Sequence, residues 1–196
     1  MRKEIWKICV LFLLVVANIG IASAANVKID PAEKTVDPGD TFTVNVYIDP
    51  GGENTAGAQF NLSFDPSVLT ANSVTEGNFL KQGGATTFFN PGTIDNGVGT
   101  INYVYGAILT PGQSVNTPGI FATISFTAKN VNGVSVLDLS DVVVGRPDGT
   151  EQSVTLADGG VVVGTPPAPV PEMNTMILTS TGIIGTLLVL RRYKKI

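Results

Sequence analysis

The chain has 196 residues with a formal net charge of −4, a single cysteine and no histidine. Ser-His-Asp catalysis, Cys-His catalysis and the usual zinc sites all need an imidazole or a thiolate. They are therefore excluded from the mature chain, because Cys9 lies in a segment expected to be removed. Residues 25–175 carry fifteen acidic and five basic side chains, a net charge of −10. Such a surface disfavours nucleic acid and anionic lipid and favours cationic, metal-linked or neutral partners, although acidity also serves solubility alone.

Residues 1–24 have the pattern of a secretory signal peptide. Three basic residues precede an apolar run over residues 8–17, and the Ala-Ser-Ala sequence ending at Ala24 has small side chains at both positions that specify cleavage. A membrane-spanning helix is the alternative, but the apolar run is short for it. We therefore expect cleavage after Ala24 and a mature chain that begins near Ala25, outside the cytoplasm.

Residues 25–164 have the length of one ordinary domain and the pattern of β-strands. Apolar and polar side chains alternate in residues 41–48, 59–64 and 120–127, with the even-numbered residues expected to face the core. Turn sequences rich in glycine, proline and asparagine separate the runs, and no stretch keeps a helical period. A single helical turn is expected to begin at Asp65. The pattern predicts an all-β, two-layer antiparallel sandwich.

The composition changes after Gly164. Residues 165–175 are proline-rich and predict an extended linker. Residues 176–190 are almost wholly apolar and carry no charge, and the basic tail 191–196 (RRYKKI) follows them. This order predicts a transmembrane or sorting helix, with the tail in the cytoplasm and the domain outside. A buried core helix is the alternative, and it fits these flanking segments poorly.

The order of linker, Pro171-Glu172-Met173, apolar helix and basic tail resembles the tripartite sorting signals that archaeosortase or exosortase enzymes recognise. The archaeal PEF-type signal is the nearest, with Met173 here in place of its phenylalanine. The resemblance implies that the helix is cut off and the domain is passed to another surface anchor. Without processing, the helix itself is the anchor.

Several segments between about Val27 and Gly164 occur in an order and spacing that resemble the cohesin domain. They are PGD before TFTVNVYI, then FNLSFDPSVLTANSVTEGNFL, GIFATISFTAK, VLDLSDVVVGRPDGTEQ and DGGVVVG. The resemblance implies a nine-stranded jelly-roll sandwich related to carbohydrate-binding modules. It also implies a non-catalytic receptor for the dockerin modules that attach enzymes or other proteins to a scaffold. The chain has no D-x-[DN]-x-[DN]-G loop, so it is not itself a dockerin, and any calcium is expected on the partner.

The predicted partner-binding residues are Gln59, Asn61, Val104 and Glu151. In cohesins of the cellulosome type, an outward asparagine and an outward aspartate just before the phenylalanine of this strand contact the dockerin. Gly57 and Gln59 stand at these positions here, so that polar contact is not carried over. Glu151 coincides with a glutamate that contacts dockerin in that subgroup, and Val104 with an apolar contact. The alternatives are a solvated loop carboxylate and a valine covered by a neighbouring strand.

Asn61-Leu62-Ser63 is the only N-x-[ST] sequon in the chain. Asn61 is expected to face solvent, and a glycan there would cover the face that a dockerin needs. An unmodified Asn61 is the alternative.

Other functions fit parts of the sequence. A polysaccharide-binding module stacks exposed aromatic side chains on sugar rings, but Trp6 lies in the signal peptide, Tyr47 is the clearest outward aromatic, and only one of Phe88 and its neighbour can face out. A glycosidase needs two carboxylates, for which Asp138 and Asp141 are suitably spaced, but an aromatic cleft is missing. A structural envelope component is a further alternative. The sequence predicts a non-catalytic protein-binding module on the cell surface, without cofactor or metal, either membrane-anchored or processed by a sortase.

Overall fold

The computed structural model describes residues 24–165. The second of the chain's two units, residues 166–196, lies outside this part, as do residues 1–23. Most of the signal peptide, the linker, the predicted membrane helix, the basic tail and the sorting motif Pro171-Glu172-Met173 therefore lie outside the described residues and remain predictions. Within residues 24–165, no helix is long and apolar enough to cross a membrane.

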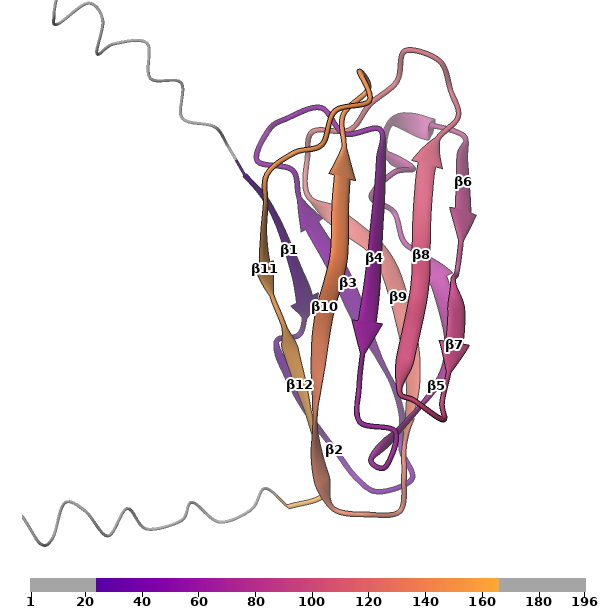
Figure 1. The fold of residues 1–196 in the computed structure, drawn as a ribbon, viewed down its shortest axis with the longest axis vertical. Coiled ribbons are helices and arrows are strands. Elements are labelled where there is room, and N and C mark those ends of the chain that lie inside the picture. The colour runs from indigo at the N-terminus through magenta and orange to yellow at the C-terminus, as the bar shows by residue number, and fades with distance from the viewer. Residues whose placement is uncertain (1–23, 166–196) are drawn as a thin grey trace, which may run out of the picture. The chain divides into compact units, whose positions relative to one another are not determined.

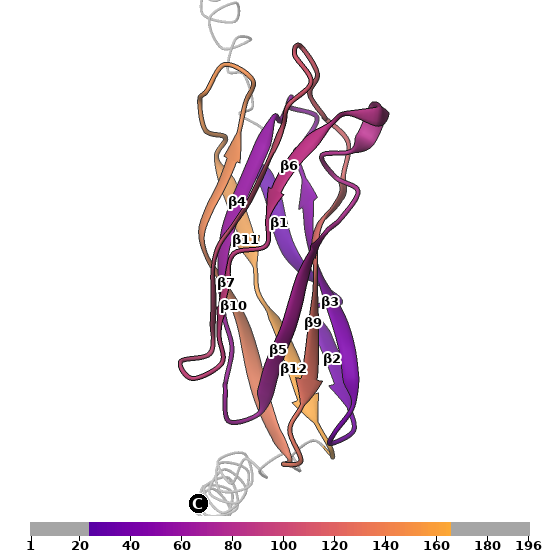
Figure 2. The ribbon, with the colours of Figure 1, turned by 90° about the vertical axis from the view of Figure 1, so that its right-hand side faces the viewer.

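The described residues form two packed β-sheets and one short 3-10 helix (Figures 1 and 2), which confirms the predicted all-β sandwich. One sheet has five strands in the order β11-β1-β3-β9-β5. The other has seven, in the order β2-β12-β10-β4-β8-β6 with β7 paired to β8. The elements are β1 (Ala25–Asp30), β2 (Glu33–Val36), β3 (Thr41–Asp49), β4 (Gly57–Ser63), β5 (Leu69–Glu76), η1 (Gln82–Gly84), β6 (Thr87–Asn90), β7 (Thr93–Asp95), β8 (Thr100–Ile108), β9 (Gly119–Ala128), β10 (Gly133–Gly145), β11 (Val154–Ala157) and β12 (Gly159–Val163).

The described residues contain twelve strands rather than the expected nine, in part because two segments each contribute to both sheets. β1 belongs to the five-stranded sheet and β2 to the seven-stranded sheet, with Pro31 between them. β11 and β12 change sheets in the same way at Asp158, whose carboxylate accepts a hydrogen bond from the Leu139 N–H at 2.9 Å. The pairs β1/β11 and β12/β2 are parallel, so the described strands are antiparallel except at these two pairings.

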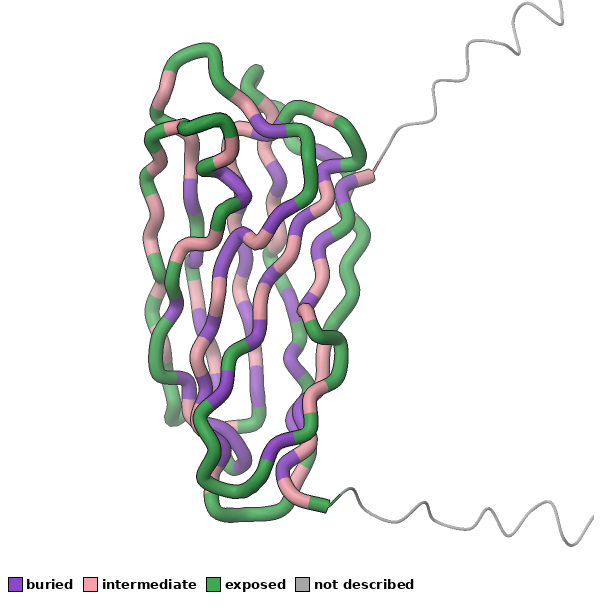
Figure 3. The backbone as a smooth tube through the Cα atoms, turned by 180° about the vertical axis from the view of Figure 1, so that it is seen from behind, coloured by how far each residue is buried: buried purple, intermediate pink, exposed green. Residues whose placement is uncertain are grey.

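Phenylalanine side chains of β9 join the two sheets. Phe126 stacks on Phe42 with 5.9 Å between ring centroids, and it meets Phe64 edge-on at 5.3 Å. Phe121 meets Phe60 edge-on at 6.0 Å. All five rings are buried, and the alternation of buried and less buried residues can be followed along the strands in Figure 3. The core is therefore a continuous aromatic and aliphatic layer between the sheets.

The alternation expected in residues 120–127 is broken at one end. The pairing of β3 with β9 shifts between Val46 and Tyr47, which leaves one extra residue in β9. Phe121 consequently turns into the core, whereas Ile120, expected inside, is only half-buried. From Ala122 onward the even-numbered residues face inward, as predicted.

Asp65 begins the expected single helical turn after β4. Its backbone carbonyl accepts a hydrogen bond from the Leu69 N–H at 2.9 Å. Its carboxylate accepts from the Ser67 hydroxyl at 2.6 Å and from the Ser67 N–H at 2.8 Å. The hydroxyl bond first, and the backbone bond second, hold the pKa of the Asp65 carboxyl below its ordinary value of 3.8.

Ser67→Ala should raise the pKa of Asp65 toward 3.8, with the backbone hydrogen bond retained. A folded-state pKa below the unfolded value stabilises the fold above about pH 4, and this contribution is lost as the pH falls through the lowered pKa. The variant should therefore be less stable than wild type at neutral pH and equal to it in strong acid. NMR titration of the Asp65 carboxyl carbon, with urea unfolding at several pH values, measures both effects. An unchanged pKa would show that the hydroxyl is not the cause.

Candidate functional site

The outer face of the five-stranded sheet carries short polar side chains from β3, β9 and β5. Many bond to one another across the strands: Thr41 Oγ1 lies 3.1 Å from Thr127 Oγ1, and the Thr123 hydroxyl donates to Asn45 Oδ1 at 2.8 Å. Such pairs satisfy their own hydrogen-bonding groups and expose little apolar area. This face therefore offers few groups that a partner protein would bind strongly.

The outer face of the seven-stranded sheet carries three exposed aromatic side chains, which we call the aromatic patch: Phe88 of β6 and Tyr103 and Tyr105 of β8. Their exposed fractions are 48%, 66% and 39%. The ring centroids of Phe88 and Tyr105 are 5.8 Å apart, so β6 and β8 present adjoining apolar surface. Exposed tyrosine and phenylalanine side chains gathered on one face are typical of surfaces that bind other molecules.

The aromatic patch is larger than the sequence indicated. Tyr47, expected to be the clearest outward aromatic, is half-buried on the other sheet, and the Lys28 ammonium lies 5.1 Å from its ring centroid. One of the adjacent phenylalanines does face out, as expected: Phe88 is exposed, whereas Phe89 meets Phe121 edge-on at 5.8 Å. The sequence alone did not reveal the patch, because only the pairing of β6 with β8 brings its members together.

Val104 is not available to a partner. Its side chain is fully buried in the core, and its pairing residue in β4 is Phe60. Side chains alternate along a strand, so when Tyr103 and Tyr105 point to solvent the residue between them must point inward. The expectation that Val104 contacts a partner is therefore wrong, and a valine covered by its neighbours is the correct description. The two tyrosines provide the outward surface of β8 instead.

Gln59 and Asn61 lie on the solvent side of β4, but they are half-buried and bonded within the sheet. Asn61 Oδ1 accepts a hydrogen bond from the Tyr103 N–H at 2.7 Å, and Asn61 Nδ2 donates to Asp141 Oδ2 at 2.8 Å. Gln59 Nε2 donates to the backbone carbonyl of Asp141 at 3.4 Å. These two side chains thus join β8, β4 and β10. A direct contact with a partner, and glycosylation of Asn61, remain predictions.

Glu151 lies at the end of the seven-stranded sheet where β4 begins. It forms an isolated bridge with Gly145, and Gly145 pairs with Gly57. The Glu151 side chain is exposed, and its backbone carbonyl accepts a hydrogen bond from Arg146 at 2.7 Å. A Cβ on Gly57 would lie 3.0 Å from the Gly106 carbonyl oxygen. β8 therefore approaches Gly57 closely, which disfavours the larger polar residue that the resemblance places there.

Asp138 and Asp141 lie on an open sheet face rather than in a cleft. Both are exposed on β10, where Asp138 Oδ2 is 3.5 Å from the Ser63 hydroxyl and Asp141 bonds to Asn61. With Glu151 they form an acidic margin on the β10 side of β4, opposite the aromatic patch. Within residues 24–165, no three Asp, Glu, His or Cys side chains are grouped to hold a metal ion.

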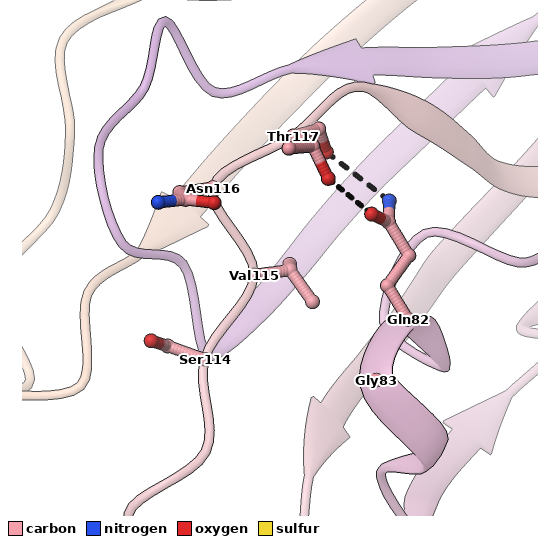
Figure 4. A pocket seen from close by; sticks show the side chains of 6 residues that line it. All are labelled: Gln82, Gly83, Ser114, Val115, Asn116 and Thr117. Atoms are coloured by element: carbon pink, nitrogen blue, oxygen red, sulfur yellow. Dashed lines mark hydrogen bonds between the residues drawn. The ribbon is translucent and has the colours of Figure 1, made fainter.

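A hollow of about 220 Å³ lies between η1 and residues 114–117 (Figure 4). Gln82 borders it: its Nε2 donates to the backbone carbonyls of Thr117 at 3.1 Å and Pro118 at 3.2 Å, and its Oε1 accepts from the Thr117 hydroxyl. The six lining residues include no charged side chain. The hollow therefore provides no general acid or base.

A two-layer β-sandwich with an aromatic patch and an acidic margin on one outer face has the surface typical of a binding module. More specifically, the chain belongs to the cohesin domain family, whose sequence profile matches residues 25–163. The family is a non-catalytic one that docks other proteins, and this agrees with the open, cleft-free arrangement of the carboxylates.

Solved cohesin structures have the same fold. The seventh ScaB type I cohesin of Pseudobacteroides cellulosolvens is 20% identical, with 75% of this chain and 97% of that chain covered and a TM-score of 0.58. A chain of the Coh-OlpA–Doc918 type I cohesin–dockerin complex from Clostridium thermocellum is 16% identical, with coverages of 72% and 99% and a TM-score of 0.58. A non-cellulosomal cohesin of the hyperthermophilic archaeon Archaeoglobus fulgidus is 17% identical, with coverages of 72% and 92% and a TM-score of 0.52. The search of curated proteins found no match.

Two neighbouring substitutions test which side of β8 faces the core. Val104→Ala should lower the free energy of unfolding by about 2 kcal/mol, because it removes two buried methyl groups and leaves a cavity. Tyr103→Ala, on the exposed side, should change it by less than about 0.5 kcal/mol. Urea unfolding of both variants measures the difference. Equal losses would contradict the inward orientation of Val104.

Proposed function

We propose that the outer face of the seven-stranded sheet docks a dockerin module. The observation that carries this proposal is the aromatic patch of Phe88, Tyr103 and Tyr105, which has no counterpart among the cross-bonded hydroxyl groups of the five-stranded face. Tyrosine side chains supply large contact areas at little cost in conformational entropy and are enriched at binding hot spots. Complexes of cohesins with dockerins among the solved structures of this fold support the same partner class.

The charges on this face favour a partner surface that is apolar with a basic margin. Three exposed carboxylates lie on β10 and the segment that follows it: Asp138, Asp141 and Glu151. The basic residue beside them is Arg146, whose Nε lies 3.6 Å from Glu53 Oε2. Opposite charges at the margin of an interface speed association and fix its orientation more than they add affinity. Association should therefore slow as the ionic strength rises, because the Debye length shortens from roughly 10 Å at 0.1 M to roughly 3 Å at 1 M.

We propose that the partner's calcium-loaded loops carry any calcium dependence.

We also propose that the domain is displayed on the cell surface. Ala25, the first residue after the predicted cleavage site, is the first residue of β1; it is fully buried and its N–H donates to the Ser153 carbonyl at 2.8 Å. Removal of the leader after Ala24 would leave every described strand intact. The tail then anchors the domain through residues 176–190, or through sorting at Pro171-Glu172-Met173.

A polysaccharide is the second candidate ligand. The observation in its favour is that Phe88 and Tyr105 place two exposed rings side by side, and sugar rings stack on such side chains. The hydroxyl-rich opposite face lacks this feature. A structural envelope component is the outcome that remains if neither ligand binds.

The first experiment is affinity capture with the exported chain, purified in mild detergent and immobilised, from the extracellular and envelope extract of the source organism. Retained proteins are identified by mass spectrometry with and without a calcium chelator. Chelator-sensitive retention of proteins with paired D-x-[DN]-x-[DN]-G loops supports the proposal. Retention of none from an extract shown to contain them, or retention of polysaccharide alone, overturns it.

Tyr103→Ala and Phe88→Ala should each weaken dockerin binding about tenfold or more, since exposed aromatic anchors commonly contribute more than about 1.4 kcal/mol to an interface. Tyr47→Ala, on the five-stranded face, is the matched control and should leave the affinity unchanged. Calorimetric titration of a captured dockerin measures the three dissociation constants. If Tyr47→Ala weakens binding and the patch variants do not, the docking face is the opposite one.

A further inference from the structure

We propose that Asn61 is a positioning residue for this docking face, acting through Tyr103 and Asp141 rather than by its own contact with the partner. The inference rests on the proposed function. β4 lies between β8 and β10, and each of these neighbours carries an irregularity beside Asn61: the register shifts between Phe60 and Leu62 in one pairing, and between Ser140 and residue 143 in the other. Asn61 is thus flanked by bulges on both sides.

The two bulges contain the non-glycine residues with positive φ among residues 24–165. These are Tyr103, with φ of 58°, and Asp141, with φ of 48°. Residues other than glycine disfavour this left-handed conformation, and they keep it only where the surrounding structure holds their backbone in place. A bulge also leaves its extra residue without a ladder partner. Both residues therefore depend on contacts other than the regular strand pairing.

The Asn61 amide bonds to both residues, to the backbone of Tyr103 and to the side chain of Asp141. Its oxygen accepts the Tyr103 N–H at 2.7 Å, and its nitrogen donates to the Asp141 carboxylate at 2.8 Å. A carboxamide has both an acceptor and a donor on one rigid group, so it bonds an N–H on one side and a carboxylate on the other. Gln59 adds a longer bond to the Asp141 backbone carbonyl, at 3.4 Å.

As a consequence, one half-buried side chain fixes the directions in which two exposed side chains point. Tyr103 is the most exposed member of the aromatic patch, and Asp141 belongs to the acidic margin. Asn61 lies between them and bonds to each. Loss of its amide would release the backbone at Tyr103 and the carboxylate at Asp141 together, without removing either partner-facing side chain.

The first test does not need the partner. In Asn61→Ala, the Tyr103 N–H loses its acceptor, so hydrogen exchange of the Tyr103 amide should become at least tenfold faster. NMR on the full chain in detergent measures this exchange. Amides of β3 and β9 should keep their protection. Ser63→Ala is the matched control, because Ser63 is also half-buried on the solvent side of β4 and makes only a 3.5 Å bond to Asp138. Unchanged exchange at Tyr103 in a folded Asn61→Ala variant overturns the inference.

The second test restores the bond by exchanging the two side chains. Asn61→Asp alone places a second carboxylate against that of Asp141, and their repulsion should weaken binding of a captured, calcium-loaded dockerin about tenfold. Adding Asp141→Asn recreates a donor–acceptor pair at the same place. The affinity should then return to within about twofold of the Asp141→Asn single variant, which keeps the pair but lacks the carboxylate of the acidic margin. This pair of variants also serves if Asn61→Ala does not fold. Failure of the exchange to restore binding overturns the inference. If wild type binds no dockerin, the proposed function fails, while the exchange rate at Tyr103 still decides whether Asn61 holds the bulge.

Discussion

The contacts that β9 makes across the interior tie β3, β4 and β6 to one core. Phe126 packs against Phe42 and Phe64, and Phe121 packs against Phe60 and Phe89, so two residues of one strand reach both sheets. Successive side chains of a strand point to opposite faces, so when alternate residues pack into this interior the residues between them face solvent. The outer faces are thus determined by the core, and what they can bind follows from which side chains remain outside.

The proposed docking face lies where this strict alternation is interrupted. A regular β8 would place Tyr103 opposite a ladder partner, whereas the bulge gives it an extra position with its N–H held by Asn61. On the other side of β4, Asp141 occupies the irregularity of β10, and its carboxylate accepts a hydrogen bond from the Asn61 amide. Bulges re-aim side chains at the cost of ladder bonds, and here side-chain amides of β4 replace the missing bonds. The site therefore depends on polar groups that are themselves only half-exposed.

The strands and the sandwich were predictable because their signal is local: alternation in residues 41–48 and 59–64 survives in β3 and β4. The site was only partly predictable. In Tyr103-Val104-Tyr105, alternation separates valine from the tyrosines but does not say which set faces inward, since all three side chains occur in cores. That orientation is set by the pairing of Val104 with Phe60 in β4. The bulges leave no sequence signal either, because neither Tyr103 nor Asp141 is a glycine.

The edges of the two sheets favour the proposed docking on a face over the addition of a strand. β2 and β11, each at one edge of its sheet, have only four residues, and β6 and β7 share the remaining edge of the seven-stranded sheet. β5 is the longest edge strand. Its Ala71 backbone is bonded on both sides by the Asn96 side chain, which donates to the carbonyl at 3.0 Å and accepts from the N–H at 2.8 Å. Short or capped edges resist the addition of another strand. A partner docked as proposed would gain its affinity from side chains on a flat surface rather than from backbone pairing, and its specificity from the placement of those side chains. Asn61 bonds to both Tyr103 and Asp141, so in the proposed docking mode a single residue of β4 would govern two side chains of the docking face.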